Sequence, residues 1–482
     1  MNDKNQFEWD IKSKTEALPH FWEHTIGSGH ATLALRADWQ KQLKRCHDEL
    51  GFKHVRFHGI LSDDMGTLVD EEDQFVYSFF NADQVMDFLV SAGMRPFVEL
   101  SFMPTALASG KKTVFHYHSN VTPPKDYSKW ATFISKLIQH WVTRYGLDEV
   151  REWFFEVWNE PNLKSFWTGS QKDYFTLYKH TVKAIKKIDK QLKTGGPATA
   201  KNAWITEFID FCKNEKLPVD FISTHHYPTD AFGKPGDDTE TQLADSKRSV
   251  LQKEAAKTKA KAGSLPVYYT EWSTSSNPFD MLHDQSYASA FVTKTIMEAR
   301  GLVKGYSYWT FSDIFEENYF SSKPFHGGFG LLNIYGIPKP AYRAYQLLHE
   351  LGEEIFPQKF SAKTIDAWLI KKENYFQLLI TNSALPEHPV TTEKIFLHLK
   401  NFPKKCKGNI QRVDDTHANA YSQWEKMGKP ESLSPKDVRI LEKSSELLLE
   451  KIDLTFSNNM VSFEIEIPPQ GIALITLKKN EK

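Results

Sequence analysis

The chain has 482 residues, which is too long for one small module and leaves room for a barrel of about 250 or more residues plus a further domain. Its 60 Lys and Arg residues balance 61 Asp and Glu residues, for a net charge of -1, so composition gives no reason to expect a nucleic-acid or membrane partner. Hydrophobic residues (40%) and charged residues (25%) are typical of a globular protein with a buried core. Aromatic residues (13%) are in excess, which suits either core packing or a cleft that binds sugar rings or flat ligands.

The cysteines and the apolar segments indicate the cellular setting. Cys46, Cys212 and Cys406 are far apart and odd in number, so neither a disulfide framework nor a zinc knuckle is expected. The N-terminal segment shows no apolar stretch typical of a secretory signal, and the sequence contains no run of about 18 apolar residues that could span a membrane. We therefore expect a cytoplasmic protein.

Short apolar or aromatic segments alternate with longer amphipathic ones through the first 350 residues or so, as in repeated βα units. The strands predicted from this pattern, in chain order, are Trp22–Ile26, His54–His58, Arg95–Leu100, Trp153–Trp158, Lys193–Gly196, Asp220–Thr224, Val267–Glu271 and Gly305–Thr310. Between and after them, spacings of three and four residues predict helices at Asp38–Leu50, Tyr174–Leu192, Ser286–Arg300 and Ala341–Leu351. Eight such units predict an α/β fold, a (β/α)8 TIM barrel over residues 13–351, although an open doubly wound sheet also alternates in this way.

The pattern changes after Gly352. Strand-like alternation replaces the helical periods, at Ala367–Ile370, Tyr375–Thr381, Lys394–Leu399, Met460–Ile467 and Gly471–Leu477. A run of strands after a run of βα units predicts a separate C-terminal β-sandwich accessory domain over residues 352–482. The Phe7–Ile11 segment, within residues 1–12, could add one strand to it.

Polar residues stand at the ends of several predicted barrel strands, where the reactive groups of such barrels collect. Glu160 precedes Pro161, which ends its strand, and Glu271 ends another strand. By strand count the two carboxylates lie across the mouth of the barrel. Glycoside hydrolysis needs such a pair: one group protonates the leaving oxygen, and the other attacks or activates water. The two groups also need unequal pKa values. A strand-end Glu is also commonly a helix-capping partner or a surface charge.

Longer motifs narrow this interpretation. Trp158–Asn162 (WNEPN) and Thr270–Trp272 (TEW) resemble the acid/base and nucleophile motifs of retaining glycosidases built on (β/α)8 barrels. With Phe21–His24, Gly27–Ala31, Val55–Met65 and Tyr308–Glu317, the chain resembles glycoside hydrolase family 39, specifically its bacterial β-xylosidases. The resemblance covers most of the first 350 residues, whereas the C-terminal region is much less specific.

The resemblance implies a role for each matching residue. Glu160 would be the acid/base, Glu271 the nucleophile, and Asn159 a ligand of the sugar 2-hydroxyl. His225 would line the site of the cleaved sugar, and Tyr227 would hold the nucleophile. His58 and Glu317 would bind the outer hydroxyls, with Glu316 as a rival for the role of Glu317. Phe115 would form part of the wall. Independently of the resemblance, Trp272 and Trp309 are expected as cleft walls, because each stands beside a polar strand end.

The implied activity is release of xylose from the non-reducing end of β-1,4-xylo-oligosaccharides by double displacement, without a cofactor or a metal. The alternatives are another specificity in the same family (arabinosidase, glucosidase or iduronidase-like) and a catalytically silent sugar-binding barrel. The adjacent Glu316 and Glu317 would repel the carboxylate of iduronate, which favours a neutral pentose. The expected partner is a short xylo-oligosaccharide, with no nucleic acid and no membrane. The resemblance also implies a homo-oligomer, with a tetramer as the expected form.

Overall fold

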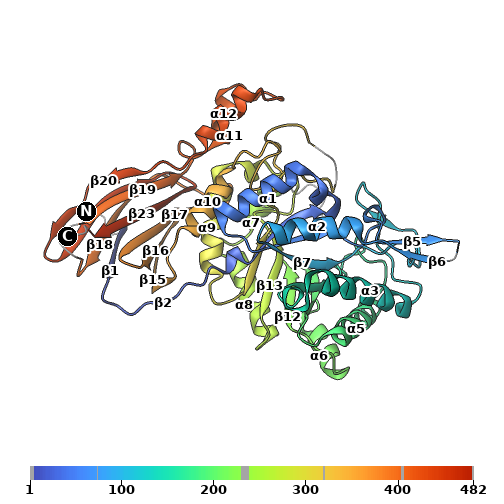
Figure 1. The fold of residues 1–482 in the computed structure, drawn as a ribbon. Helices are drawn as coiled ribbons and strands as arrows, with labels where there is room; N and C mark the ends of the chain where they lie inside the picture. Colours follow the sequence, from blue (N-terminus) through green and yellow to red (C-terminus); the bar gives the residue numbers. More distant parts are fainter. Residues whose placement is uncertain (1–4, 73, 230–237, 318–320, 403–405, 480–482) are drawn as a thin grey trace.

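Eight parallel strands close into a barrel at the centre of the computed structural model, which describes residues 5–72, 74–229, 238–317, 321–402 and 406–479 (Figure 1). The strands follow one another around the barrel in chain order, and the last pairs with the first. They are β3 (Thr25–His30), β4 (His54–His58), β7 (Arg95–Leu100), β10 (Phe154–Val157), β11 (Lys193–Ala200), β12 (Phe221–His225), β13 (Val267–Trp272) and β14 (Gly305–Tyr308). The predicted barrel is therefore confirmed, and an open sheet is excluded.

Helices connect the barrel strands and cover the outside of the barrel. They are α1 (Ala37–Leu50), α2 (Phe80–Ser91), α3 (Tyr127–Tyr145), α4 (Leu147–Val150), α5 (Gln171–Ile188), α6 (Ile205–Asn214), α7 (Thr239–Asp245), α8 (Val250–Ala262), α9 (Ser286–Glu298) and α10 (Pro340–His349). In α5, Ser170 and Asp173 form a capping box at the first turn, and Tyr174, Leu177 and Tyr178 are buried at the predicted spacing. No helix of the described residues is both long enough and apolar enough to cross a membrane.

The first barrel strand lies further along the chain than predicted. The aromatic residues of Phe21–Glu23 form a 3₁₀ turn, and the strand begins at Thr25 and runs through Gly27-Ser28-Gly29. A β-carbon at Gly27 would lie 2.6 Å from the Trp309 ring and 2.9 Å from the Tyr308 carbonyl oxygen, so this position has room only for glycine. Because close packing replaces large apolar side chains here, the strand lacks the apolar signal used to find the others.

Smaller elements decorate the loops of the barrel. Two antiparallel ribbons pair β5 (Leu68–Glu71) with β6 (Gln74–Tyr77) and β8 (Thr113–Val114) with β9 (Ser119–Asn120). Further 3₁₀ turns lie at Ala31–Leu35, Asp63–Met65 and Met281–Asp284. The β8–β9 ribbon lies in the loop after β7, and its hairpin residue His116 donates its backbone N–H to the Glu317 carbonyl oxygen after β14. The loops after these two strands therefore meet at the C-terminal end of the barrel.

The C-terminal part of the chain forms a two-sheet sandwich (Figure 1). One sheet has the order β1-β18-β22-β21 and the other β2-β15-β16-β17-β23-β19-β20. Their strands are β1 (Gln6–Asp10), β2 (Glu16–Ala17), β15 (Glu354–Ala362), β16 (Ile365–Lys372), β17 (Tyr375–Asn382), β18 (Glu393–Lys400), β19 (Cys406–Val413), β20 (Glu450–Ile452), β21 (Thr455–Ser457), β22 (Met460–Ile467) and β23 (Gly471–Lys479). Strand β1 is the predicted N-terminal contribution. Strand β2 pairs with β15, and the division of the chain at residues 12 and 351 stays a prediction.

Two helices, α11 (Ala420–Lys426) and α12 (Pro435–Ser444), lie between β19 and β20, where only strands were expected. Their apolar residues Tyr421, Trp424 and Leu441 pack on Phe325 and Ile337 of the loop after β14. Figure 1 shows the pair projecting beyond the sandwich on the side of this loop. Ser434 and Asp437 form a capping box at the start of α12, a signal readable in the sequence as Ser-Pro-Lys-Asp.

Candidate active site

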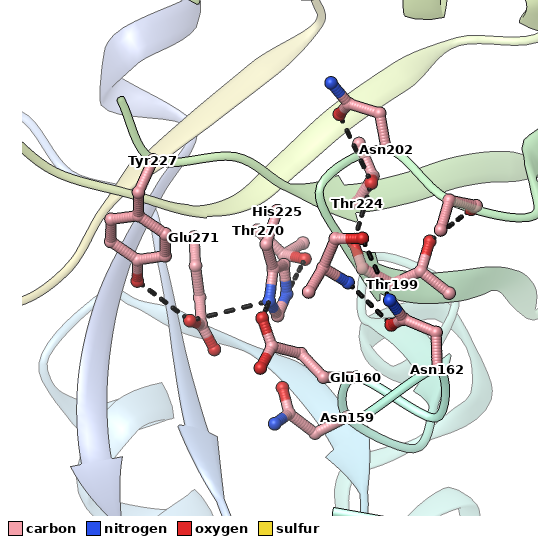
Figure 2. Close-up of polar contacts among 12 residues, drawn as sticks. Asn159, Glu160, Asn162, Thr199, Asn202, Thr224, His225, Tyr227, Thr270 and Glu271 are labelled. Atoms are coloured by element: carbon pink, nitrogen blue, oxygen red, sulfur yellow. Dashed lines mark hydrogen bonds and ion pairs between the residues drawn. The ribbon is translucent and has the colours of Figure 1, made fainter. Parts of the chain in front are cut away.

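Glu160 and Glu271 lie at the C-terminal ends of barrel strands and face one pocket (Figure 2). Glu271 belongs to β13, and Glu160 follows the end of β10 by three residues. Both contact Nδ1 of His225, the last residue of β12: a Glu160 oxygen at 2.9 Å and a Glu271 oxygen at 3.5 Å. One oxygen of each carboxyl group lies within 4.8 Å of an oxygen of the other. This close approach agrees with the roughly 5–5.5 Å between the carboxyl groups of retaining glycosidases, which is shorter than the roughly 6.5–9.5 Å of inverting ones.

Glu160 sits on a strained turn. Trp158 and Glu160 have positive φ angles of 71° and 43°, which non-glycine residues adopt at a cost of about 1–3 kcal/mol each. Trp158 is fully buried against Trp167 and donates its indole N–H to the Phe166 carbonyl oxygen. The Glu160 backbone N–H donates to the Ala198 carbonyl oxygen at 2.8 Å. These anchors hold the turn so that Asn159 and Glu160 both reach the pocket.

The Glu160 carboxyl group is an acid at neutral pH. The residue is 9% exposed, and this burial raises the pKa of Glu160 to about 7, although the cationic side chains of His58 and Arg56 oppose the rise. A raised pKa keeps the proton on the group below about pH 7, as a general acid requires. The neighbouring His225 is also buried, which lowers the pKa of its imidazole to about 4 and keeps the ring neutral.

The Glu271 carboxyl group accepts hydrogen bonds on both of its oxygens. Arg56 donates an N–H to Oε1 at 2.8 Å, and Tyr227 donates its hydroxyl to Oε2 at 2.9 Å. The imidazole of His58 lies 3.7 Å from Oε1. The hydroxyl and the guanidinium fix the direction of the carboxyl group.

Arg56 organises the floor of the pocket. Its guanidinium is fully buried and bonds to Glu156 (2.6 Å), Glu99 (2.7 Å), Glu271 (2.8 Å) and the Asn159 side-chain oxygen (2.9 Å). A buried cation is stable only when it is paired, and three carboxylates meet that need here. The bond to Asn159 orients its amide with the oxygen toward Arg56.

His58 joins the floor to the rim. Nδ1 lies 2.7 Å from Glu99 and Nε2 lies 3.2 Å from Glu317. Burial favours the neutral ring, but the Glu99 and Glu317 carboxylates outweigh it and raise the pKa of His58 to about 10. Glu316 points elsewhere: its carboxylate lies 4.0 Å from Nε2 of His116 and accepts a bond from the Thr32 hydroxyl. The geometry therefore favours Glu317 over Glu316 as the residue that faces a ligand.

Aromatic rings line the pocket near His58. The Trp309 ring centroid lies 4.9 Å from the His58 ring and the Phe115 centroid 6.1 Å from it. Trp272, expected as a wall, is instead fully buried and stacks on Tyr306 with centroids 4.3 Å apart. The reason is the alternation of β13: Glu271 points into the barrel, so its neighbour Trp272 points outward into the layer between strand and helices.

Two groups of side chains among the described residues could hold a metal ion. One is Glu160, His225 and Glu271 in the pocket; the other is His20, Glu23 and His349 away from it, where both imidazoles bond to one Glu23 oxygen. In both groups hydrogen bonds join the same atoms that a metal would bind. The expectation that no metal is needed stays a prediction.

Comparison with known proteins decides the family. The family model described as "Glycosyl hydrolases family 39" matches residues 6–457. The chain belongs to this family. A beta-xylosidase of Caldicellulosiruptor saccharolyticus is 49% identical over 464 residues, which cover 95% of each chain. A solved GH39 enzyme from Xanthomonas axonopodis pv. citri has a TM-score of 0.88 and 30% identity, covering 100% of this chain and 98% of its own. A monomeric beta-xylosidase from Caulobacter crescentus CB15 has a TM-score of 0.86 and 31% identity, covering 99% and 100%.

The predicted family 39 resemblance is thus confirmed. The structure brings together nine predicted site residues: Glu160, Glu271, His58, Phe115, Asn159, His225, Tyr227, Trp309 and Glu317. Their individual roles stay predictions, as does the predicted homo-oligomer. Sequence reasoning missed Glu99 and Glu156, which stand inside apolar strands. A charged residue within a strand that is expected to be buried is itself a signal, since such a group must have a partner.

Proposed function

We propose that this glycosyl hydrolase is a retaining exo-β-xylosidase, which releases xylose from the non-reducing end of β-1,4-xylo-oligosaccharides. The observation that supports the retaining mechanism is the pair of carboxyl groups with one oxygen of each within 4.8 Å, of which Glu160 has a pKa raised by burial and Glu271 is bonded to Arg56. The substrate rests on the relatives, which include the Caldicellulosiruptor saccharolyticus beta-xylosidase.

In the first step a Glu271 oxygen attacks the anomeric carbon while Glu160 gives its proton to the departing glycosidic oxygen. The C–O bond to the aglycone breaks as the C–O bond to Glu271 forms, which leaves a covalent glycosyl-enzyme and an ionised Glu160. The Arg56 and Tyr227 donors orient the nucleophile for this attack. Because Asn159 turns its oxygen to Arg56, its NH₂ group is the one that can donate to the sugar 2-hydroxyl.

In the second step ionised Glu160 takes a proton from water as the water oxygen attacks the anomeric carbon. The bond to Glu271 breaks, xylose leaves with its original configuration, and Glu160 is again protonated. The His58 and Glu317 side chains, which lie 3.2 Å apart, would bind the outer hydroxyls of the sugar. A Glu317 carboxylate at this position disfavours a uronate, which supports a neutral sugar.

Azide rescue of Glu271→Gly tests the mechanism. We expect the variant to lose nearly all activity on an aryl β-xyloside and to recover turnover with azide, with a glycosyl azide of inverted configuration as product. Recovery requires that azide fits into the space left by the Glu271 side chain while the rest of the site stays intact. Binding of xylose without recoverable turnover would instead indicate the silent sugar-binding barrel.

A panel of nitrophenyl glycosides tests the substrate. The expected order places the β-xyloside above the α-arabinoside, the β-glucoside and the α-iduronide in kcat/KM. If the β-xyloside is hydrolysed no faster than the others, the pentose assignment is wrong even though the double displacement stands. Product analysis on xylotriose and longer chains distinguishes release of single xylose units from internal cleavage.

A further inference from the structure

A chain of hydrogen bonds leads from Glu160 away from the sugar pocket and into the floor of the barrel (Figure 2). Nδ1 of His225 lies 2.9 Å from Glu160 Oε1, and Nε2 of the same ring lies 3.1 Å from the Thr270 hydroxyl. Thr270 donates that hydroxyl to Glu156 Oε1 at 2.8 Å, and Glu156 Oε2 accepts an N–H from Arg56 at 2.6 Å. Each residue that contributes to these bonds is at most 9% exposed, so water does not substitute for them.

The charge at the floor fixes the direction of each bond. Glu156 is paired with Arg56 and is therefore an acceptor, so the single hydroxyl proton of Thr270 points to it. The Thr270 oxygen then presents only lone pairs to His225, which must carry its proton on Nε2. With Nε2 protonated in a neutral ring, Nδ1 has a lone pair and can only accept. Two carboxyl groups face it, Glu160 at 2.9 Å and Glu271 at 3.5 Å, and only Glu160 lies within normal hydrogen-bond distance.

We propose that Thr270 and Glu156 are positioning residues that hold His225 in its Nε2–H tautomer, so that Nδ1 accepts the carboxylic proton of Glu160. The proposal rests on the proposed role of Glu160 as proton donor. In this arrangement a protonated Glu160 gains a hydrogen bond, whereas an ionised Glu160 meets a lone pair. The opposite tautomer would place an N–H against Glu160 and favour the carboxylate. These hydrogen bonds therefore keep Glu160 protonated between turnovers.

Other charged groups also face Glu160 and act on its ionisation independently of these hydrogen bonds. They are His58 and Arg56 from β4, Glu99 from β7, Glu271 from β13 and Glu317 from the loop after β14. The two cations favour ionised Glu160, and the carboxylates favour its protonated form. None of these groups bonds to the Thr270 hydroxyl, so a change at Thr270 acts on Glu160 through His225.

Thr270→Val tests the proposal, because valine keeps the shape and removes the hydroxyl. Without the Thr270 hydroxyl as acceptor, the Nε2–H tautomer of His225 is no longer favoured over the Nδ1–H tautomer. The Nδ1–H tautomer can then donate to ionised Glu160. We expect the basic limb of the pH profile of kcat/KM to move down by about one pH unit. The free energy of a hydrogen bond to a charged group corresponds to a pKa change of about that size. Thr224→Val is the matched control: this buried threonine of β12 donates to the Thr199 carbonyl oxygen, and its loss should leave the limb in place.

Glu156→Gln supplies a second variant of unchanged shape. The glutamine oxygen can still accept from Arg56, but its NH₂ would face Thr270, which would then turn its hydroxyl proton toward His225 and reverse the chain. The ring ¹⁵N shifts of His225, assigned against His225→Gln, should show protonated Nε2 in the parent and protonated Nδ1 in Glu156→Gln. Protonated Nδ1 in the parent protein, or an unmoved basic limb in both folded variants, would overturn the proposal. The NMR measurement needs no turnover, so failure of the proposed function is seen separately in the azide experiment.

Discussion

At the scale of single residues, Glu160 and Glu271 differ in their partners rather than in their exposure. They are 9% and 5% exposed, yet only Glu271 is bonded to a guanidinium. Burial without a direct cationic partner raises the pKa of Glu160 to about 7. One arginine of β4 therefore distinguishes the surroundings of two identical side chains.

The pKa of Glu160 predicts the basic limb of activity. Because this pKa is raised to about 7, the acid form is present below that pH and is lost as the pH rises through it. We expect kcat/KM on an aryl β-xyloside to fall above about pH 7 and the fall to disappear in Glu160→Gln. The variant should lose more activity on substrates with poor leaving groups than on activated ones, because only poor leaving groups need the proton. An equal loss on both kinds of substrate would contradict the assignment.

Tyr227→Phe isolates the hydroxyl that orients the nucleophile. The change removes the 2.9 Å bond to Glu271 and keeps the ring. A hydrogen bond to a charged group is worth about 1.5–3 kcal/mol, so kcat/KM should fall about 10- to 100-fold without loss of thermal stability. Tyr178→Phe is the control, because that hydroxyl donates to the Pro218 carbonyl oxygen outside the pocket. A similar loss in both variants would indicate a general effect on the fold.

Residue types at strand ends predict which side chains reach the pocket, but not which partners hold each side chain in position. Glu160, Glu271 and Tyr227 stand beside turn or strand-end signals in the sequence. The partners of Arg56 could not be paired in this way, since Glu99 and Glu156 lie on other barrel strands, β7 and β10, and no local sequence pattern encodes their contacts with it. Strand order and register, set by the closed barrel, bring them together.

At the scale of elements, helix α9 joins the two parts of the molecule. Almost every residue of Ser286–Glu298 is buried, because the helix packs on α8 and α10 of the barrel and on β17 and β23 of the sandwich. The sequence predicted the helix but not this double contact. A helix with small and apolar residues all around is expected to be buried on every side, and Ser286-Tyr-Ala-Ser-Ala-Phe-Val is such a sequence.

A buried ion cluster reinforces this junction and supplies a stability prediction. Asp366 of β16 is fully buried and lies 2.5 Å from Arg248, 3.1 Å from Lys359 and 3.8 Å from Lys294. Asp366→Asn leaves three cations without their shared carboxylate, which should cost about 3–5 kcal/mol in the free energy of unfolding measured by urea denaturation. Asp48→Asn breaks an exposed pair with Lys44 and should cost about 1 kcal/mol or less.

The difference in free energy of unfolding between the parent and Asp366→Asn should depend on pH in a definite direction. Burial alone would raise the pKa of Asp366, but Lys294, Arg248 and Lys359 outweigh it and lower the pKa below its usual value. The stabilisation is therefore complete at neutral pH and is lost as the pH falls through the lowered pKa. The stability gap between the parent and Asp366→Asn should shrink in acid. A gap that stays constant down to acid pH would show that Asp366 contributes through packing rather than charge.

At the scale of the whole molecule, the N-terminus belongs to the C-terminal sandwich. Strand β1 runs parallel to β18, and Phe7 and Trp9 are 4% and 1% exposed in the sandwich core. The intervening β2 pairs with β15 before the chain enters the barrel. The first and the last strand of the described residues therefore lie in the same unit, and the barrel lies between two segments of it. Alternation predicted β1, but its parallel partner lies almost 400 residues away and could not be read from the pattern.

This arrangement predicts that a substitution that destabilises the sandwich also destabilises the barrel. Trp9→Ala should destabilise the sandwich by about 3–5 kcal/mol. If α9 and the ion cluster couple the two parts, the barrel thiols Cys46 of α1 and Cys212 of α6, both buried, should react with a maleimide at a lower urea concentration in this variant. Phe456→Ala removes a ring of β21 that is 36% exposed and should leave the labelling midpoint nearly unchanged. Unchanged labelling of Cys46 and Cys212 in Trp9→Ala, with the sandwich already unfolded, would mean that the barrel is stable on its own and that the junction carries little coupling.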